Sequence, residues 1–257
     1  MTVTERRQEI LALINKEGNM RAADLAEHFH VTSETIRKDL IYLNNKRLLK
    51  KGHGSAHTIS ETVEFSVEQR LLENSSVKIA IAQKALEYLS ECSVIFIDAG
   101  STLMELAKRM PALPQLVIIT NSFSVVQALQ HTGNTIYFVG GEVNAITQST
   151  SGLWANNELS SLRIDIAFLG TSGFQSHTGP CTKIFSDAQF KKDVVKNSNK
   201  IIVLADHTKF SSNAIMQFAE WTDVDLLISD NNVTPELASI LQDEVELILA
   251  TPDDSSI

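Results

Sequence analysis

A polar loop after an apolar run holds the first residues that could bind a small ligand. The run at residues 94–98 ends in Asp98, and Gly100, Ser101 and Thr102 follow at the start of a helical pattern. A glycine and hydroxyl residues at a helix start present free backbone N–H groups and the positive end of the helix dipole to an anion. Asp98 would repel a phosphate at close range, so its carboxylate better suits a ligand hydroxyl group or the amides of its own loop. A tight turn with an ordinary helix cap is the alternative interpretation.

A second loop of this kind follows the next apolar run. Residues 116–120 form a strand pattern, and Asn121 and Ser122 separate Thr120 from a further helical pattern. In open α/β sheets the carboxyl ends of the strands form the ligand crevice, so both loops are expected to line it. An anion there also needs nearby cations, although a lysine by itself is more often a solvated surface charge. The candidate cations are Lys183, Lys191 and Lys209, and residues 172–184 are the candidate lid.

The first sixty residues carry a different set of polar side chains, on a pattern that predicts a DNA-reading helix. Residues 33–45 place apolar side chains at helical spacing on an inner face, and Thr32 or Ser33 can cap the helix. The outer face can enter a major groove and hydrogen-bond base edges and phosphates. Its residues are Glu34, Thr35, Arg37, Lys38, Tyr42 and Asn45. A three-helix protein-interaction module with a solvated charged face is the alternative.

A basic turn after this helix extends the predicted DNA-binding surface. Lys51, His53 and Gly54 lie in a strand–turn–strand pattern, where lysine can neutralise phosphates and glycine lets the backbone approach them. Residues 1–57 hold ten Lys/Arg against seven Asp/Glu, whereas the rest of the chain holds 12 against 24. A small basic module on an acidic body is typical of a DNA reader joined to a domain that must not itself bind DNA.

The elements that must position these residues fall into two domains. Residues 1–57 predict a winged helix-turn-helix, residues 58–74 a linker and an anchoring segment, and residues 75–257 an effector-binding domain. Alternating strands and helices in the last domain predict an open, largely parallel α/β sheet, Rossmann-like in class. Helices are expected at 5–16, 21–29, 33–45, 78–89, 102–109, 124–130, 187–197 and 235–241. Strands are expected at 94–98, 116–120, 135–139, 164–170, 200–205, 226–229 and 246–249.

Composition indicates a globular protein without staples or anchors. The chain has 257 residues, of which 43% are hydrophobic and 21% charged, so two cores can close without disulfides or metals. Cys92 and Cys181 form no CxxC pair and are interpreted as free thiols in a reducing compartment. The seven histidines favour structural or phosphate-contacting roles over a zinc site. No apolar run predicts a signal peptide or a membrane span. We therefore expect a cytoplasmic protein with no metal, no cofactor and no membrane partner.

Two segments near the N-terminus resemble a known family. They are Val31-Thr32-Ser33-Glu34-Thr35-Ile36-Arg37-Lys38-Asp39-Leu40 and, after Leu48-Leu49, His53-Gly54-Ser55-Ala56. They closely resemble the V-S-x-x-T-I-R-R-D-L helix and H-G-G-A wing of the DeoR family of bacterial transcriptional regulators. Lys38 departs from the pattern by keeping the charge of arginine without its bidentate geometry, and Ser55 replaces a wing glycine. The residues expected to contact DNA are Arg21, Thr32, Ser33, Glu34, Thr35, Arg37, Lys38, Lys51, His53 and Gly54.

The resemblance continues over nearly the whole chain. It implies a sensor domain related in fold to sugar-phosphate isomerases, which binds a phosphorylated sugar or a similar metabolite. The matching positions expected to bind this effector are Asp98, Gly100, Ser101, Thr102, Thr120, Asn121, Ser122, Gly140, Gly141, Gly170, Lys191 and Lys209. One departure is Asp187, which starts an Asp-Ala-x-x-Lys run where the family often has Glu, and it puts the identity of the ligand in doubt.

Three functions compete for this sequence. The first is a transcriptional regulator, most simply a repressor of a carbohydrate-utilisation operon, which binds double-stranded DNA as a homo-oligomer, a dimer or tetramer. The second is a sugar-phosphate isomerase-type enzyme with an appended DNA-binding domain. It would need a general base, for which Asp98, Asp187, Glu142 and His207 are candidates without an evident pair. The third is a protein-interaction module. We expect the regulator and no enzyme activity.

Overall fold

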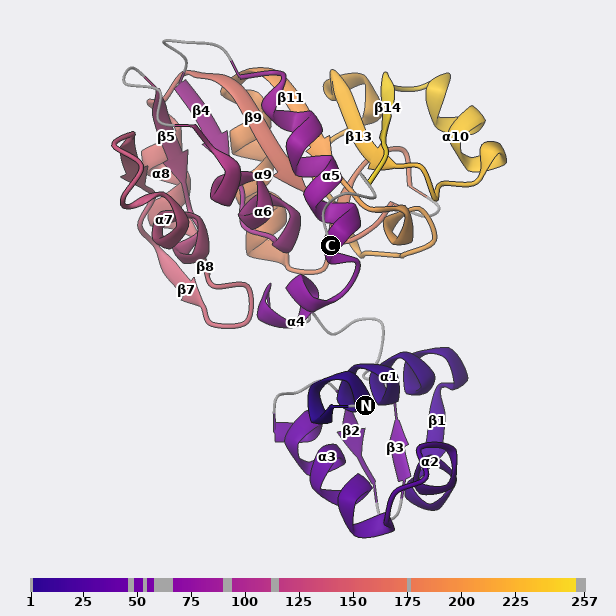
Figure 1. Cartoon of the computed structure of the whole chain (residues 1–257). Coiled ribbons are helices and arrows are strands. Elements are labelled where there is room, and N and C mark those ends of the chain that lie inside the picture. Colours follow the sequence, from indigo (N-terminus) through magenta and orange to yellow (C-terminus); the bar gives the residue numbers. More distant parts are fainter. Residues whose placement is uncertain are drawn as a thin grey trace. The chain divides into compact units, whose positions relative to one another are not determined.

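The computed structural model of the chain describes residues 2–45, 49–52, 55–57, 67–89, 94–111, 116–174 and 177–252. The chain forms two compact units, Met1–Phe65 and Ser66–Ile257, called the N-terminal and C-terminal units below (Figure 1). His53 and Gly54 of the expected wing lie outside the described residues. No helix in the described part of the chain is long and apolar enough to cross a membrane.

Three helices and a three-stranded antiparallel sheet make up the N-terminal unit (Figure 1). Helix α1 (Val3–Glu17) begins at a capping box between Thr2 and Glu5, and it ends at Gly18, whose φ of 75° favours glycine. The sheet order is β1-β3-β2. The other elements are β1 (Asn19–Arg21), α2 (Ala22–His28), α3 (Ser33–Asn45), β2 (Lys50–Lys51) and β3 (Ser55–His57). The predicted winged helix-turn-helix is confirmed, and β1 is an addition that the sequence did not indicate.

A buried carboxylate joins α1 to α3 on the inner side of this unit. Asp39 of α3 is 1% exposed and accepts hydrogen bonds from the Nε atoms of Arg6 and Arg7, both at 2.7 Å. The Arg7 guanidinium also lies 3.8 Å from the centre of the Tyr42 ring. Hydrogen bonds between ionised groups are about twice as strong as neutral ones. These contacts fix the orientation of α3, and they engage two of the basic residues of the unit inside the protein.

Asp39→Ala is expected to lower the free energy of unfolding of the N-terminal unit by roughly 1–3 kcal/mol, because it leaves two arginines without their shared carboxylate. Chemical denaturation followed by circular dichroism measures this change. Glu27→Ala, which removes an exposed carboxylate from α2, is the control and should change stability by less than about 0.5 kcal/mol. Equal effects of the two substitutions would show that the Asp39 contacts do not stabilise the unit.

A parallel sheet of seven strands forms the centre of the C-terminal unit (Figure 1). Its order is β14-β13-β11-β9-β4-β5-β6, and every pairing between neighbours is parallel. The strands are β4 (Val94–Ile97), β5 (Val117–Thr120), β6 (Thr135–Phe138), β9 (Ile164–Gly170), β11 (Ser198–Leu204), β13 (Leu226–Asp230) and β14 (Leu247–Ala250). Because the chain starts at β4, moves outward to β6 and then resumes at β9 on the other side of β4, the strand order reverses between β4 and β9.

Helices cover both faces of this sheet, and each face has its own core. Successive strand residues point to opposite faces, so Ile95 and Ile97 join one buried cluster while Phe96 joins the other. The first cluster includes residues of α5 (Ser75–Leu86), α6 (Ser101–Arg109) and α7 (Phe123–Leu129). The second includes residues of α8 (Leu153–Leu159), α9 (Phe185–Lys196) and α10 (Pro235–Gln242). The α/β class and the largely parallel sheet predicted from the sequence are confirmed.

Several short elements were not predicted. Strands β7 (Glu142–Asn144) and β8 (Ser149–Ser151) form a hairpin, and α8 follows at once. Strand β10 (Cys181–Thr182) lies within the expected lid of residues 172–184, and it pairs with β12 (Met216–Gln217), which lies outside that range. Helix α4 (Val67–Leu72) and the one-turn helices η1 (His207–Lys209) and η2 (Trp221–Asp223) complete the unit. These elements are short and mostly polar, so they carry little periodic hydrophobic signal.

Candidate functional site

Helix α3 begins at a pair of threonines. The Thr32 hydroxyl oxygen accepts a hydrogen bond from the backbone N–H of Thr35 at 3.2 Å, and the two hydroxyl groups lie 2.9 Å apart. Thr32 is therefore the N-cap, and Ser33 is the first helical residue. The cap stabilises the end of the helix that would enter a groove, and it occupies the Thr32 hydroxyl within the protein.

The outer face of α3 is open to solvent. Ser33, Glu34, Arg37 and Lys38 are all exposed, and Thr35 is half-buried. The Arg37 side chain is 62% exposed, and its guanidinium approaches Glu34 only to 3.9 Å, so little energy is needed to redirect it toward another acceptor. Arg21 is also exposed, on β1, while Lys51 lies in β2. Ser33, Glu34, Arg37, Lys38 and Arg21 are therefore accessible to a partner.

In the C-terminal unit, three candidate residues meet where the strand order reverses. Asp98 follows β4, and its Oδ2 accepts a hydrogen bond from the backbone N–H of Gly170, the last residue of β9, at 2.9 Å. The Lys191 Nζ of α9 lies 2.7 Å from the same oxygen and donates to the Gly170 carbonyl at 2.8 Å. Asp98 and Lys191 are 0% and 4% exposed. The reversal point of an open parallel sheet is where ligands of such folds bind.

The Asp98 cluster contains two carboxylates, Asp98 and Asp187, and one ammonium group, that of Lys191. Burial raises the pKa of Asp98, Lys191 opposes that rise, and Asp187 adds to it. Asp187 lies 3.7 Å from the Lys191 Nζ and accepts a hydrogen bond from the Thr182 hydroxyl at 2.6 Å. The Oδ1 atom of Asp98 is buried and accepts no hydrogen bond from any described residue. A buried carboxylate oxygen without a donor is costly, so this atom can accept a hydrogen bond from a ligand.

The second predicted loop lies beside this cluster but uses most of its polar groups internally. The Thr120 hydroxyl donates to the Ile97 carbonyl at 2.6 Å, and the Ser122 hydroxyl caps α7. The Asn121 amide nitrogen donates to the Thr150 carbonyl at 2.8 Å, which attaches the β7–β8 hairpin to the loop. The Asn121 Oδ1 is buried and has no partner among the described residues. Asn121 is therefore the residue of this loop best able to bind a ligand.

One of the candidate glycines is required by the backbone. Gly141 has a φ of 151°, and a Cβ there would lie 2.6 Å from the Ser151 carbonyl oxygen, so the β7–β8 hairpin requires it. The Gly140 N–H donates to Glu158 at 3.2 Å. Gly100 precedes α6 with a φ of 158°, and Ser101 and Thr102 are buried at the helix start. The backbone of the Gly100 loop thus remains the candidate anion site, whereas Gly140 and Gly141 shape the hairpin.

Two further charged residues, Asp206 and Lys209, follow the end of β11. Lys209 is half-buried in η1 and lowers the pKa of its neighbour Asp206, with help from the Thr208 hydroxyl and Lys78, against the opposing effect of burial. Lys78, which is 3% exposed on α5, was not among the residues predicted to be functional. The available signal was its position beside Val77 and three residues before Ile81, on the apolar stripe of the helix. A lysine on such a stripe must be satisfied by buried partners.

The pKa of Lys78 predicts how its contribution to stability depends on pH. Burial lowers this pKa from 10.5 to about 8, so between these values the unfolded chain binds a proton that the folded chain has released. Stability from Lys78 therefore rises with pH through this window. Relative to Lys78→Met, we expect the unfolding free energy of the wild type to increase by roughly 1–3 kcal/mol between about pH 7.5 and about pH 10.

Guanidinium unfolding of both proteins across this pH range measures the effect. Lys84→Met is the control, because Lys84 lies on the same helix but pairs with Glu87 at an exposed position. Parallel pH curves for wild type and Lys78→Met would contradict the lowered pKa.

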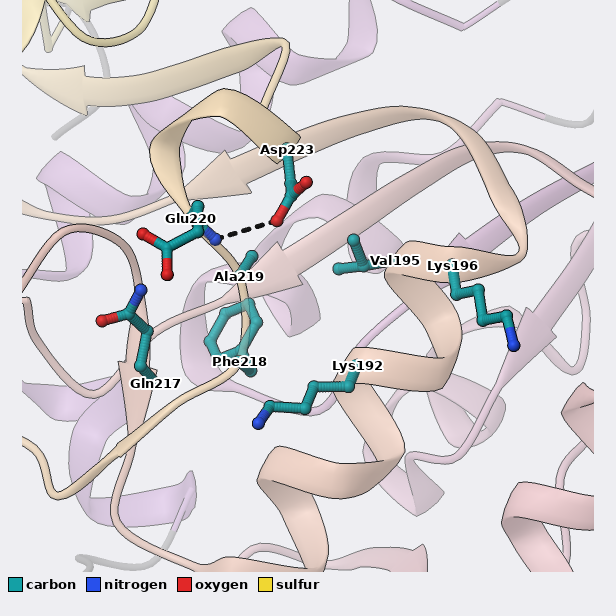
Figure 2. Close-up of a pocket in the computed structure, with 8 residues that line it drawn as sticks. All are labelled: Lys192, Val195, Lys196, Gln217, Phe218, Ala219, Glu220 and Asp223. Atoms are coloured by element: carbon teal, nitrogen blue, oxygen red, sulfur yellow. Dashed lines mark hydrogen bonds between the residues drawn. The ribbon is translucent and has the colours of Figure 1, made fainter.

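A separate cleft of about 660 Å³ lies on the outer side of α9 (Figure 2). Lys192, Val195 and Lys196 of α9 form one wall, and the segment from Gln217 to Asp223 forms the other. This segment precedes β13, so the cleft lies toward the amino ends of the strands. Phe218 lines the cleft, and the centre of its ring lies 5.0 Å from the Lys191 Nζ. The cleft contains none of the predicted effector residues.

The contacts that join Asp98, Gly170, Lys191 and Asp187 do not include His207, Glu142 or Cys181. His207 pairs with Asp230 at 2.9 Å, and Glu142 is exposed at the start of β7. Cys181 is a buried free thiol. Within the described residues, no three His, Cys, Asp or Glu side chains gather in a group that could hold a metal ion.

Comparison with known families gives two matches. A family model described as the DeoR C terminal sensor domain matches residues 73–231. A second, described as a DeoR-like helix-turn-helix domain, matches residues 6–62. Together these ranges include α1 to α3 and most of the parallel sheet.

Individual relatives are similar over almost their full lengths. An HTH-type transcriptional regulator, YulB, of Bacillus subtilis is 31% identical, over 98% of this chain and 98% of its own. The HTH-type transcriptional regulator GlpR of Haloferax volcanii is 30% identical, over 91% and 92%. The glycerol-3-phosphate regulon repressor of Escherichia coli is 29% identical, over 94% and 95%. Among solved structures, ribose 5-phosphate isomerase A of Methanocaldococcus jannaschii aligns with 54% of this chain and 55% of its own at 20% identity and a TM-score of 0.39, which is too distant to bear on function.

Proposed function

Because the chain belongs to the DeoR family of transcriptional regulators, we propose that it represses a carbohydrate-utilisation operon and responds to a phosphorylated sugar. The N-terminal unit binds the operator, and the C-terminal unit binds the effector. The observation that carries the effector site is the buried Asp98–Lys191 pair at the reversal point of the sheet, with an Asp98 oxygen that lacks a donor.

The proposed DNA interface is the outer face of α3 with the wing. Arg37 is the residue best suited to read a base, because its exposed guanidinium can donate two hydrogen bonds to a guanine edge. Lys38, Thr35 and Ser33 reach bases or phosphates from the same face, and Arg21 and Lys51 contact the phosphate backbone. Glu34 selects against wrong bases through its charge, and the Thr32 cap positions the helix.

The proposed effector lies across the carboxyl ends of β5, β4, β9 and β11. Its phosphate binds the backbone N–H groups at the start of α6, where the helix dipole favours an anion, and Lys209 adds a nearby positive charge. Its hydroxyl groups donate to the Asp98 Oδ1 and the Asn121 Oδ1, two buried oxygens that have no hydrogen-bond partner among the described residues. A ligand that carries both a phosphate and neighbouring hydroxyl groups satisfies both ends of this crevice, which is the chemistry of a sugar phosphate.

The isomerase alternative is not favoured. An isomerase needs a base that can take a proton from the substrate carbon. His207 is paired with Asp230, and the Asp98 Oδ2 is bound by Lys191 and Gly170, so of these two candidate residues only the Asp98 Oδ1 could take this role. The relatives are named as regulators and repressors. Measurable turnover of pentose or hexose phosphates would reinstate this alternative.

The regulator is proposed to act as a dimer or tetramer. A single recognition helix reads only a short half-site, and oligomers gain specificity by reading two. Leu153, Trp154 and Phe185 are each more than 70% exposed, at the starts of α8 and α9, which the Ser151–Ser186 hydrogen bond joins. Exposed apolar side chains of this size are typical of protein–protein contacts. Sedimentation equilibrium tests the proposal, and a monomer at all concentrations would refute it.

A thermal-shift screen tests the effector assignment. Glycerol 3-phosphate and ribose 5-phosphate are compared with glycerol, ribose and inorganic phosphate, each with the full chain. A ligand that binds only the native state stabilises it by about 2.7 kcal/mol when its concentration is 100 times its dissociation constant. This stabilisation raises the melting temperature. We expect a phosphorylated compound to stabilise the C-terminal unit more than its unphosphorylated counterpart. Equal responses to both would refute the phosphate site.

A further inference from the structure

Helix α4 occupies a special position in the chain. It is the first described element of the C-terminal unit, and residues 58–66 separate it in sequence from β3, the last described element of the N-terminal unit. Any signal that passes along the backbone from the effector site to the DNA-binding unit must therefore pass through α4. Each end of α4 makes hydrogen bonds to a part of the C-terminal unit that borders the proposed effector crevice.

The C-terminal end of α4 is held by Lys78. The Lys78 Nζ donates to the carbonyl oxygen of Glu73 at 2.7 Å and to that of Arg70. The last carbonyl groups of a helix lack partners within the helix, so this buried ammonium group caps α4. The charged groups that face Lys78 are Asp206, Lys209, Glu73 and Arg70. Two of these, Asp206 and Lys209, belong to the segment after β11 that borders the crevice.

The N-terminal end of α4 is held by the β7–β8 hairpin. The Val67 N–H donates to the Ile146 carbonyl at 3.3 Å, and Val67 is 1% exposed. The same hairpin is bonded to Asn121 through Thr150. Figure 1 shows α4 beside the end of this hairpin and next to α6, the helix that starts with the Gly100 loop. Both anchors of α4 thus connect to residues that line the crevice.

We propose that Lys78 is the coupling residue of the regulator: it exchanges the carbonyl groups of α4 for the charge of an anionic effector, and so releases α4 when the crevice is occupied. This inference rests on the proposed effector site. A phosphate near Lys209 adds negative charge beside Asp206 and attracts the Lys78 ammonium group. The α4 carbonyl groups then lose their cap, the helix end frays, and the chain that leads to the DNA-binding unit gains freedom. Lys78 thus responds to the charge of the effector, and it acts on the DNA-binding unit only through α4.

The test compares Lys78→Met with Lys84→Met on the full chain. Operator affinity is measured with and without whichever of glycerol 3-phosphate and ribose 5-phosphate raises the wild-type melting temperature. Allosteric couplings are typically about 5–150-fold, and we expect a change in this range for wild type and Lys84→Met. Lys78→Met lacks the α4 cap with and without the probe, so we expect a ratio near one, at the operator affinity that the wild type shows with the probe bound, while the probe still raises the melting temperature. A wild-type ratio in Lys78→Met would overturn the proposal and leave the regulator function intact.

Hydrogen exchange on the wild type provides a second readout, which does not depend on how the variant folds. Addition of the probe should accelerate exchange of the α4 amides while the strands β4 and β9 remain protected. Unchanged α4 exchange at a probe concentration that raises the melting temperature would overturn the proposal. If neither sugar phosphate nor inorganic phosphate shifts the wild-type melting temperature, the effector assignment fails first, and the coupling role of Lys78 fails with it.

Discussion

Lys191→Met is expected to destabilise the C-terminal unit by about 3–5 kcal/mol, because it leaves the buried Asp98 carboxylate without its cation. The pair is 2.7 Å apart and almost fully buried, so solvent cannot replace the lysine. The same change removes the group that fixes Asp98 at the reversal point of the sheet, so we also expect loss of stabilisation by sugar phosphates. Thermal and denaturant unfolding, each with and without glycerol 3-phosphate, measure both effects.

Two further variants separate charge from packing at this site. Asp98→Asn combined with Lys191→Met removes both charges and should recover much of the lost stability, because no buried ion remains. Lys192→Met changes the neighbouring residue of α9, which is exposed beside the outer cleft, and should be close to neutral. If the double variant is no more stable than Lys191→Met, the loss arises from packing and the ion pair is not its cause.

Arg37→Ala is expected to weaken operator binding by about 1–3 kcal/mol and to relax discrimination at one base position, as the loss of a bidentate base contact does. Lys51→Ala should instead weaken binding to every sequence about equally and reduce the dependence on salt, because phosphate contacts carry no sequence information. Fluorescence anisotropy with the operator and with a duplex of unrelated sequence measures both changes.

Arg163→Ala is the matched control for the removal of a positive charge. Arg163 is exposed and lies in the C-terminal unit, just before β9, so its loss should leave operator affinity unchanged. The assignment of α3 as the reading helix fails if Arg37→Ala behaves like Arg163→Ala, or if it weakens both duplexes to the same degree.

The sequence predicted the elements whose apolar residues recur at a regular spacing or form a run. α3 begins and ends at the predicted residues because its apolar positions recur at helical spacing and Thr32 caps it. β9 likewise matches its predicted range, since a mostly apolar run, interrupted only by Asp165, is typical of a strand buried on both faces. Asp98, Gly170 and Lys191 were each proposed as site residues, and the structure brings all three into contact.

Other features depend on contacts between distant residues, which spacing along the chain cannot reveal. The β7–β8 hairpin consists of two polar three-residue strands and is held by Asn121, more than twenty residues earlier. Asp39 was assigned to the family motif without a physical role, because Arg6 and Arg7 meet it only in the folded unit. Lys78 was read as part of an ordinary helix, since its partners are backbone carbonyl groups that carry no sequence signal.

Binding of the full chain to the DNA upstream of its own operon, titrated against salt and against sugar phosphates, tests the central claim most directly. We expect a preference for that DNA over an unrelated duplex, with a log affinity that falls linearly with log salt, by about 0.9 for each phosphate neutralised. We also expect a phosphorylated sugar, and not its unphosphorylated form, to change this affinity. Equal affinity for both duplexes, unmoved by salt and by every sugar phosphate, would contradict this claim.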